Sequence, residues 1–99
     1  MIYVLVERHI ADGMESTYQL VARQALEAAY RAPGFINGET LRDMQRPNHH
    51  YLLSKWRSLH DWKRWYYSSE RLEVMNQLNP TLADFETITL LEHWMAGGG

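Results

Sequence analysis

The chain has 99 residues, 45% of them hydrophobic and 22% charged, a composition typical of one globular domain and not of a disordered or fibrous chain. Its net charge of −2, with basic residues interleaved among acids, lacks the basic footprint of nucleic-acid binding. The absence of cysteine excludes disulfides, and the N-terminal apolar run is far shorter than the roughly 20 residues that span a bilayer. We therefore expect a cytoplasmic protein with neither nucleic acid nor membrane as a partner.

The chain opens on a continuous apolar segment rich in β-branched side chains, which predicts a strand over 2–6. Successive side chains of a strand alternate between its two faces. Both faces are apolar here, with Ile2, Val4 and Val6 on one and Tyr3 and Leu5 on the other. Both faces of this strand therefore need cover.

The segment from Met14 to Arg31 predicts a helix, because its apolar positions recur with helical spacing and polar residues occupy the opposite side. Its alanines favour a helix, and the following Ala-Pro-Gly sequence predicts the turn that ends it. Two strands are predicted next, over 35–42 and 50–56, with a bulge at Gly38 in the first of them.

Ser58 and Asp61 have the spacing of a capping box, with aspartate in place of the usual Glu or Gln, and predict the start of a second helix. A short helix over 70–78 and a final strand over 85–93 follow. The elements therefore have the order βαββαβ, an α+β, ferredoxin-like arrangement with a four-stranded antiparallel sheet.

The helices of such an arrangement return to the same face of the sheet and leave the second face uncovered. The first strand is apolar on both faces, so another layer is needed there. An identical sheet from a second copy is the simplest such layer, and twofold dimers are the commonest oligomers. We therefore expect a homodimer that forms through the sheet faces.

The densest aromatic feature lies between Trp56 and Ser68, where five large aromatic side chains occur in twelve residues. Trp62 and Tyr66 fall on one stripe of the predicted helix and can anchor it to the sheet, whereas Trp65 points off that stripe. Two interpretations stay open. The aromatic side chains are core or interface residues, or together they form the wall of a pocket for a flat aromatic ligand.

The five histidines show no metal-ligand spacing, because His49 and His50 are adjacent and point to opposite faces of a strand. We therefore predict no metal site. His60, in the first turn of the aromatic helix, is a candidate general base or a surface histidine. Glu7 shares a strand face with Leu5, and if that face lies under the helices its carboxylate is a second candidate base. The alternative for Glu7 is an ion pair at the strand end.

Several short motifs together resemble the antibiotic biosynthesis monooxygenase domain of the dimeric α+β barrel superfamily. They are the opening Met-Ile-x-Val, a helix ending in Ala-Pro-Gly-Phe, a strand closing on Trp56-x-Ser58, and a helix ending near Trp65-x-x-Ser68. The resemblance implies a dimeric barrel with a pocket in each subunit between sheet and helices. We expect a single domain of this kind over 1–96, followed by a flexible glycine tail over 97–99.

Proteins similar to this one include cofactor-independent oxygenases of polyphenols and quinols, and haem-degrading enzymes. Trp65 matches a tryptophan of the haem-degrading branch, but Glu7 stands where that branch has an asparagine, and Met75 where it has the haem-ligating histidine. The aromatic-polyketide branch has an asparagine and a tyrosine where this chain has Leu52 and Trp62. No branch's catalytic set is complete here.

The leading hypothesis is a monooxygenase that acts on a small electron-rich aromatic molecule, a quinol or polyphenol. The residues expected to bind the ring are Trp62, Trp65, Tyr66 and Met75, and Glu7 or His60 is expected to deprotonate a hydroxyl. The chain lacks a Gly-rich phosphate loop, and its histidines lack metal-ligand spacing, so we expect neither flavin, metal nor nucleotide cofactor. Two alternatives stay open: a non-catalytic dimer that binds haem or another planar ligand, with Met75 as axial contact, and an isomerase or hydrolase of a small metabolite.

Overall fold

The computed structural model describes residues 1–94, so the expected domain boundary at residue 96 and the glycine tail over 97–99 lie outside the described residues. Within residues 1–94 the elements are β1 (Ile2–His9), α1 (Glu15–Tyr30), β2 (Phe35–Arg42), β3 (His49–Trp56), α2 (Leu59–Tyr66), α3 (Ser69–Leu78), a 3₁₀ turn (Asn79–Thr81) and β4 (Thr87–Leu91). None of the helices in this part of the chain combines the length and the apolarity needed to cross a membrane.

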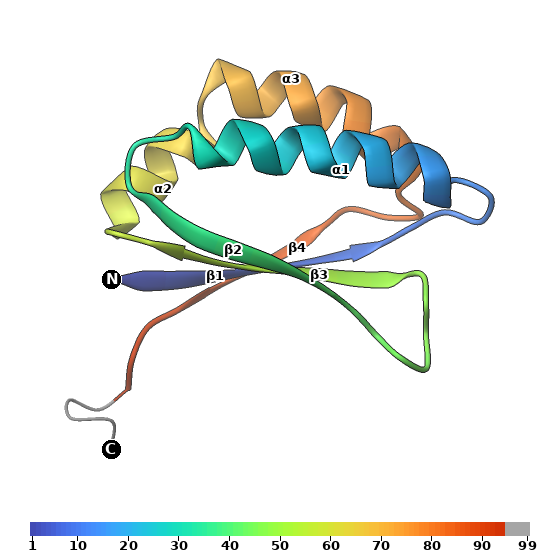
Figure 1. The fold of residues 1–99 in the computed structure, drawn as a ribbon, viewed down its shortest axis with the longest axis horizontal. Helices are drawn as coiled ribbons and strands as arrows, with labels where there is room; N and C mark the ends of the chain where they lie inside the picture. The colour runs from blue at the N-terminus through green and yellow to red at the C-terminus, as the bar shows by residue number, and fades with distance from the viewer. Residues whose placement is uncertain (95–99) are drawn as a thin grey trace.

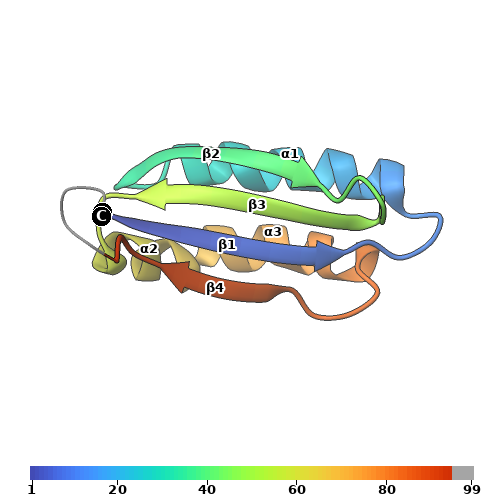
Figure 2. The same ribbon diagram turned by 90° about the horizontal axis from the view of Figure 1, so that it is seen from below.

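The strands of residues 1–94 form one four-stranded sheet in the order β2-β3-β1-β4, and each neighbouring pair is antiparallel. The helices all pack on the same face of this sheet, as Figure 1 shows. Figure 2 shows the other face with no helix in front of it. The predicted α+β, ferredoxin-like fold with a four-stranded antiparallel sheet is therefore confirmed, and its second helical segment consists of α2 and α3.

The strand ends differ from the sequence prediction. β1 continues beyond Val6 to His9, because its pairing with β3 runs on to the last residue, where His9 lies opposite His49. The final strand is shorter than the predicted 85–93, since its ladder with β1 covers only Thr87–Leu91. A strand end is thus set by its partner in the sheet and not by its own apolar pattern.

The bulge predicted at Gly38 lies slightly earlier in β2. The register of β2 against β3 shifts between Phe35 and Asn37, and Gly38 itself pairs normally with Ser54. A Cβ atom at Gly38 would lie 3.1 Å from Cζ of Phe35. The glycine therefore makes room for an aromatic ring instead of kinking the strand.

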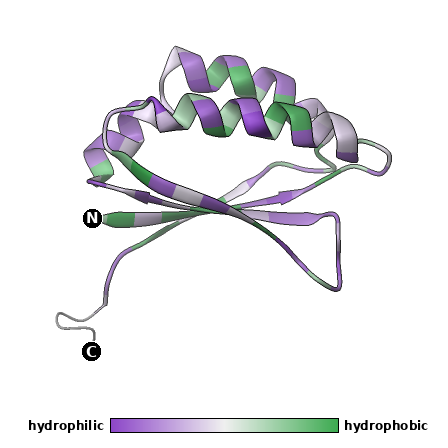
Figure 3. Ribbon diagram, in the orientation of Figure 1, coloured by the Kyte–Doolittle hydropathy of each residue, from purple (hydrophilic) through white to green (hydrophobic). Residues whose placement is uncertain are grey.

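The core lies between the sheet and the helices. Val4, Val6 and Ile10 alternate along one side of the first strand and are buried there, and Trp56 of β3 is only 1% exposed. Each helix carries hydrophobic residues beside hydrophilic ones (Figure 3), as expected for helices with one face on a core. The covered face of the sheet is therefore the even-numbered face of β1.

A cluster that we call the Asp61 junction, formed by Gly34, Arg57, Ser58 and Asp61, joins the two turns that flank this core. The backbone N–H of Arg57 donates to the Gly34 carbonyl at 2.7 Å, and Arg57 Nε donates to Asp61 Oδ2 at 2.8 Å. The predicted helix cap at Ser58 is confirmed, because its hydroxyl accepts from the backbone N–H of Asp61 at 3.1 Å. The Arg57 and Ser58 hydrogen bonds hold the pKa of Asp61 below its ordinary value.

Gly34 and Gly13 provide a matched test of this junction. Both glycines have positive φ, +89° and +81°, but a Cβ at Gly34 would overlap the Asp61 side chain, whereas a Cβ at Gly13 would meet nothing within 4 Å. Gly13→Ala should cost about 1 kcal/mol of unfolding free energy through backbone strain alone, and Gly34→Ala about 3 kcal/mol or more because overlap is added. Urea unfolding followed by circular dichroism measures the loss of unfolding free energy in both variants. Equal losses would contradict the close packing of Gly34 against Asp61.

Candidate functional site

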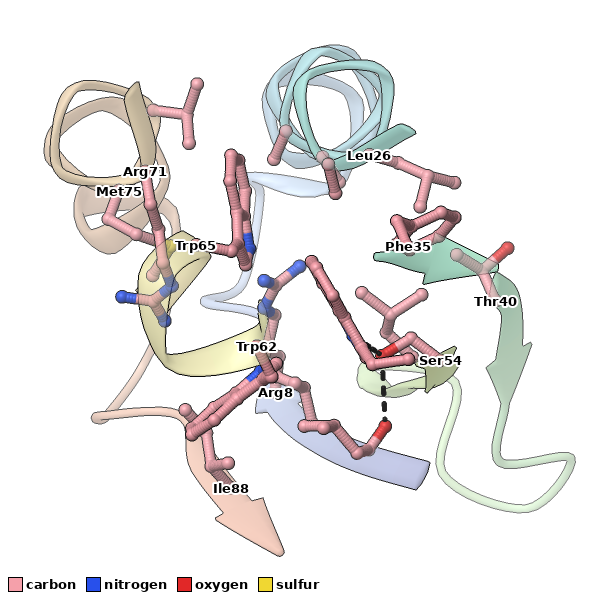
Figure 4. A pocket seen from close by; sticks show the side chains of 18 of the residues that line it. Arg8, Leu26, Phe35, Thr40, Ser54, Trp62, Trp65, Arg71, Met75 and Ile88 are labelled. Carbon is pink, nitrogen blue, oxygen red and sulfur yellow. Dashed lines mark hydrogen bonds between the residues drawn. The ribbon is translucent and has the colours of Figure 1, made fainter. Parts of the chain in front are cut away.

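A cavity of about 60 Å³ lies between the covered sheet face and the helices. Figure 4 shows its walls, which come from the sheet on one side and from α1, α2 and α3 on the other. Its apolar lining includes Val6, Ala25, Leu52, Trp56, Val74 and Ile88. The volume is well below the roughly 300 Å³ at which pockets for drug-sized ligands begin. A haem does not fit this volume, and a single aromatic ring requires the walls to move apart, since a cavity known to bind benzene measures about 150 Å³.

The aromatic helix α2 supplies one wall of this cavity. Trp62, which is 9% exposed, and the half-buried Trp65 both line it, and Met75 of α3 lines it beside them. Tyr66 is not among the lining residues. Its ring packs against the ring of Trp62 at 5.0 Å between centroids and supports that wall from behind. The structure therefore brings three of the four predicted ring-binding residues to one cavity.

The two predicted bases lie away from this cavity. The expectation for Glu7 required its strand face to lie under the helices, and the structure places that face on the uncovered side of the sheet, where Glu7 pairs with Tyr51 and Thr87. His60 is exposed in the first turn of α2 and does not line the cavity. The helix directs Trp62 inward, so the position two residues earlier points outward.

A buried charged cluster was not foreseen from the sequence. Arg8 Nε donates to Glu86 Oε2 at 3.0 Å, and Arg71 pairs with the other oxygen of the same carboxylate. The side chains of Arg8, Glu86 and Arg71 are only 9%, 10% and 16% exposed. Both arginines line the cavity, and Figure 4 shows Arg8 reaching into it from β1 and Arg71 from α3. We call these three residues the arginine–glutamate cluster.

Strand alternation could have indicated one member of this cluster. Val4, Val6 and Ile10 occupy alternate positions on the buried side of β1, and Arg8 falls between them in the same series. The sequence prediction ended this strand at Val6 because charge follows, and so placed Arg8 outside the sheet. Its partner Glu86 lies in the loop before β4, although the predicted strand over 85–93 would have put it on the same face as Ile88.

Tyr18 and His50 lie next to this cluster. Arg8 Nη1 donates to the Tyr18 hydroxyl at 3.5 Å, a weak bond, and the His50 ring packs edge-to-face on the Tyr18 ring at 5.2 Å. Burial lowers the pKa of His50, against the opposing effect of its hydrogen bond to the Pro47 carbonyl. The lowered pKa favours the neutral form of the His50 imidazole. Tyr18 itself is among the residues that line the cavity.

Histidines and carboxylates of residues 1–94 form no group of three or more that could hold a metal ion. His9 and His49 lie side by side on the uncovered face of the sheet. Their rings stack at 4.4 Å between centroids with 18° between planes. Stacked rings of this kind point their nitrogens along the ring planes and not toward a shared ion.

A family model described as antibiotic biosynthesis monooxygenase matches residues 1–77 of the chain. The search of curated proteins found no match. Among solved structures, one of an antibiotic biosynthesis monooxygenase is 14% identical and superimposes with a TM-score of 0.85, covering 94% of this chain and 98% of the other.

Two further solved structures are similar to the chain. SnoaB, a cofactor-independent oxygenase from Streptomyces nogalater, is 16% identical with a TM-score of 0.83, covering 99% of this chain and 98% of its own. Rv0793 from Mycobacterium tuberculosis is 12% identical with a TM-score of 0.85, covering 97% of both chains. At these identities the likeness establishes a common fold.

The arginine–glutamate cluster makes a prediction about stability. Glu86→Gln would leave two buried guanidinium groups without a carboxylate, so the unfolding free energy should fall by about 3 kcal/mol. Asp43→Asn is the matched control, because it removes an ion pair in which the Arg46 side chain is 62% exposed, and it should leave stability almost unchanged. Urea unfolding at pH 7 compares the two variants. Similar small effects would mean that the cluster is not buried as described.

Proposed function

Because this chain belongs to the antibiotic biosynthesis monooxygenase family, we propose that it is a monooxygenase that acts on a small electron-rich aromatic molecule, a quinol or polyphenol, without flavin, metal or nucleotide cofactor. The observation that carries the proposal is the cavity between sheet and helices, which Trp62 and Trp65 wall on one side. SnoaB, which is described as a cofactor-independent oxygenase, has the same fold and supports the cofactor-free form of the proposal.

In this chemistry the substrate supplies every electron. Loss of a hydroxyl proton gives an electron-rich anion, whose ring carbon donates electrons to dioxygen and forms a bond to one oxygen atom. That atom stays on the ring as a carbonyl, and the other leaves as water. The two hydrogens of the water come from the substrate hydroxyl and from the oxidised ring carbon, so no other reductant is required.

The cavity residues divide between holding the ring and moving its proton. Trp62, Trp65 and Met75 contact the ring in this proposal, and Tyr66 keeps Trp62 in place from behind. Tyr18 lines the cavity and its hydroxyl accepts a weak hydrogen bond from Arg8, whereas Glu7 and His60 do not line the cavity. We therefore favour Tyr18 as the group that exchanges a proton with the substrate.

Oxygen uptake over a panel of quinols and polyphenols, with no added cofactor, tests this function. We expect saturable uptake, and we expect Trp65→Ala to lower kcat/KM by about tenfold or more because the ring loses a stacking wall. Trp94→Ala is the matched control, since Trp94 is 90% exposed and lies outside the cavity, and it should keep full turnover. Equal losses in both variants, or no uptake with any member of the panel, would contradict the proposal.

The same assay separates the candidate bases. Tyr18→Phe removes only the Tyr18 hydroxyl and should lower kcat much more than KM, whereas Glu7→Gln and His60→Ala should keep kcat. Tyr67→Phe controls for loss of a phenol elsewhere, because Tyr67 is 79% exposed. Loss of kcat in Glu7→Gln or His60→Ala, with Tyr18→Phe active, would return the role to the base first predicted from the sequence.

We also propose that the uncovered sheet face joins two copies of the chain. Its side chains include Leu5 of β1, which lies between Leu53 and Thr89 of the neighbouring strands, and these three residues are only partly covered within one chain. A second copy of the same face would remove this surface from water, and a twofold axis makes the face complementary to itself.

Multi-angle light scattering at micromolar concentration tests the dimer. The wild-type chain should have about twice its own mass of 11.7 kDa. Leu5→Glu should give a folded monomer, because it places charge at the centre of the sheet face without touching the core under the helices. Leu20→Glu on α1 is the matched control, since Leu20 is 60% exposed on the helical side, and it should stay dimeric. A monomeric wild type would contradict the proposal.

A further inference from the structure

We infer that the cavity binds its aromatic ligand as an anion, with the anionic oxygen against Arg8 and Arg71. The inference rests on the proposed function only in placing an aromatic ring in the cavity, and it adds the charge that the ligand must carry. The oxygen belongs either to a carboxylate on the ring or to a ring hydroxyl that ionises in the site. Three properties of the arginine–glutamate cluster lead to this conclusion.

The first property is its charge. Two guanidinium groups share the single carboxylate of Glu86, and the salt bridges of Arg8 and Arg71 within residues 1–94 run only to that residue. The cluster therefore keeps one net positive charge although its side chains are between 9% and 16% exposed. A buried charge without a partner is unfavourable. An anion in the cavity would supply the missing partner.

The second property is the direction from which this charge can be reached. Arg8 and Arg71 line the cavity, whereas Glu86 is not among the lining residues. The carboxylate thus binds both arginines without being part of the cavity wall itself. The other cavity walls are mainly apolar, so the arginines are the charged part of a largely hydrocarbon lining.

The third property is the supply of unused donors. A guanidinium has five N–H groups, and within residues 1–94 Arg8 uses Nε for Glu86 and Nη1 for Tyr18. The guanidinium carbon of Arg71 lies over the Tyr66 ring, 4.4 Å from its centre, in a cation–π contact. No fully buried side-chain nitrogen of the described residues lacks a hydrogen-bond partner, so the unused donors are not sealed in the protein. They are free to bind an oxygen in the cavity.

Hydrogen bonds from guanidinium groups to oxyanions are about twice as strong as those between neutral groups. The apolar surroundings strengthen the attraction further, because they lower the effective dielectric constant. The cavity should therefore prefer an anionic ring to a neutral ring of the same shape. For the proposed oxidation, the same contacts would stabilise the ionised hydroxyl, which is the form that reacts with oxygen.

Benzoate and benzamide test the charge preference, because they have nearly the same shape and differ in charge. Quenching of tryptophan fluorescence at pH 7 gives the dissociation constant of each from the wild-type protein. We expect benzoate to bind about tenfold or more tightly than benzamide. Equal affinities for benzoate and benzamide would overturn the inference. So would the absence of saturable benzoate binding up to about 10 mM, a concentration on the order of the weakest dissociation constants of specific ligands.

Variants that change the net charge separate recognition from folding. Arg8→Gln leaves Arg71 and Glu86 as a neutral pair, so it should abolish the preference for benzoate. Arg8→Gln combined with Glu86→Gln leaves the positive charge of Arg71 without a carboxylate partner. This double variant should regain at least part of the preference for benzoate, although it changes one residue more than Arg8→Gln. Arg46→Gln is the control, because Arg46 lies in the exposed turn before β3, and it should leave the preference intact. A combined variant that is folded, by circular dichroism, and still shows no preference would overturn the inference.

A second probe distinguishes the two sources of the anion. 4-Nitrophenol absorbs in the visible range only when ionised, so a site that stabilises a phenolate lowers its apparent pKa on binding, and we expect a decrease of about one unit in the wild type and none in Arg8→Gln. A decrease assigns the site to ionised hydroxyls as well as carboxylates, and tight benzoate binding without it assigns the site to carboxylates. If the protein prefers benzoate but takes up no oxygen, the proposed oxidation is wrong and the anion site stands. If it takes up oxygen but shows no preference for benzoate, the anion site is wrong and the proposed oxidation stands.

Discussion

The fold depends on the alternation of side chains along β1, one of the two central strands of the sheet. Its even-numbered residues face the helices and its odd-numbered residues face the uncovered side. A shift of one residue in its register would exchange these faces and bury Glu7 in place of Arg8. The apolar side chains of Val4, Val6 and Ile10 therefore fix not only the core but also which charge enters the cavity.

That single constraint gives the two sheet faces different functions. The covered face places Arg8 beside Trp56, Trp62 and Trp65 in the cavity wall, where a lower effective dielectric constant strengthens electrostatic interactions. The uncovered face has Leu5 at its centre and charged or imidazole side chains toward one end, the composition of a surface that another protein chain can cover. Both the candidate site and the proposed dimer follow from the orientation of one strand.

The order of elements could be predicted because it rests on local patterns. The helical spacing before Arg31, the cap at Ser58 and the apolar run at the start of β1 each depend on residues close in the chain. The length of β1 and the position of the bulge in β2 could not be predicted from the sequence, because both depend on pairing with β3. For the site, the density of aromatic side chains after Trp56 was enough to select Trp62 and Trp65, although helix periodicity placed Trp65 off the stripe of Trp62. The arginine–glutamate cluster joins residues 8, 71 and 86, and no local pattern connects them.

The anchoring of α2 has a consequence for how a ligand enters the cavity. A helix of eight residues is too short to persist alone, and α2 is fixed at its start by the Asp61 junction and at its end by the Ser68 hydroxyl, which donates to the Trp65 carbonyl at 2.7 Å. With both ends fixed, the helix and its two tryptophans move together. Widening the cavity then requires displacement of a whole segment, a motion of microseconds to milliseconds and not the nanosecond rotation of one side chain. Displacement of α2 would therefore limit the rates at which a ligand enters and leaves the cavity.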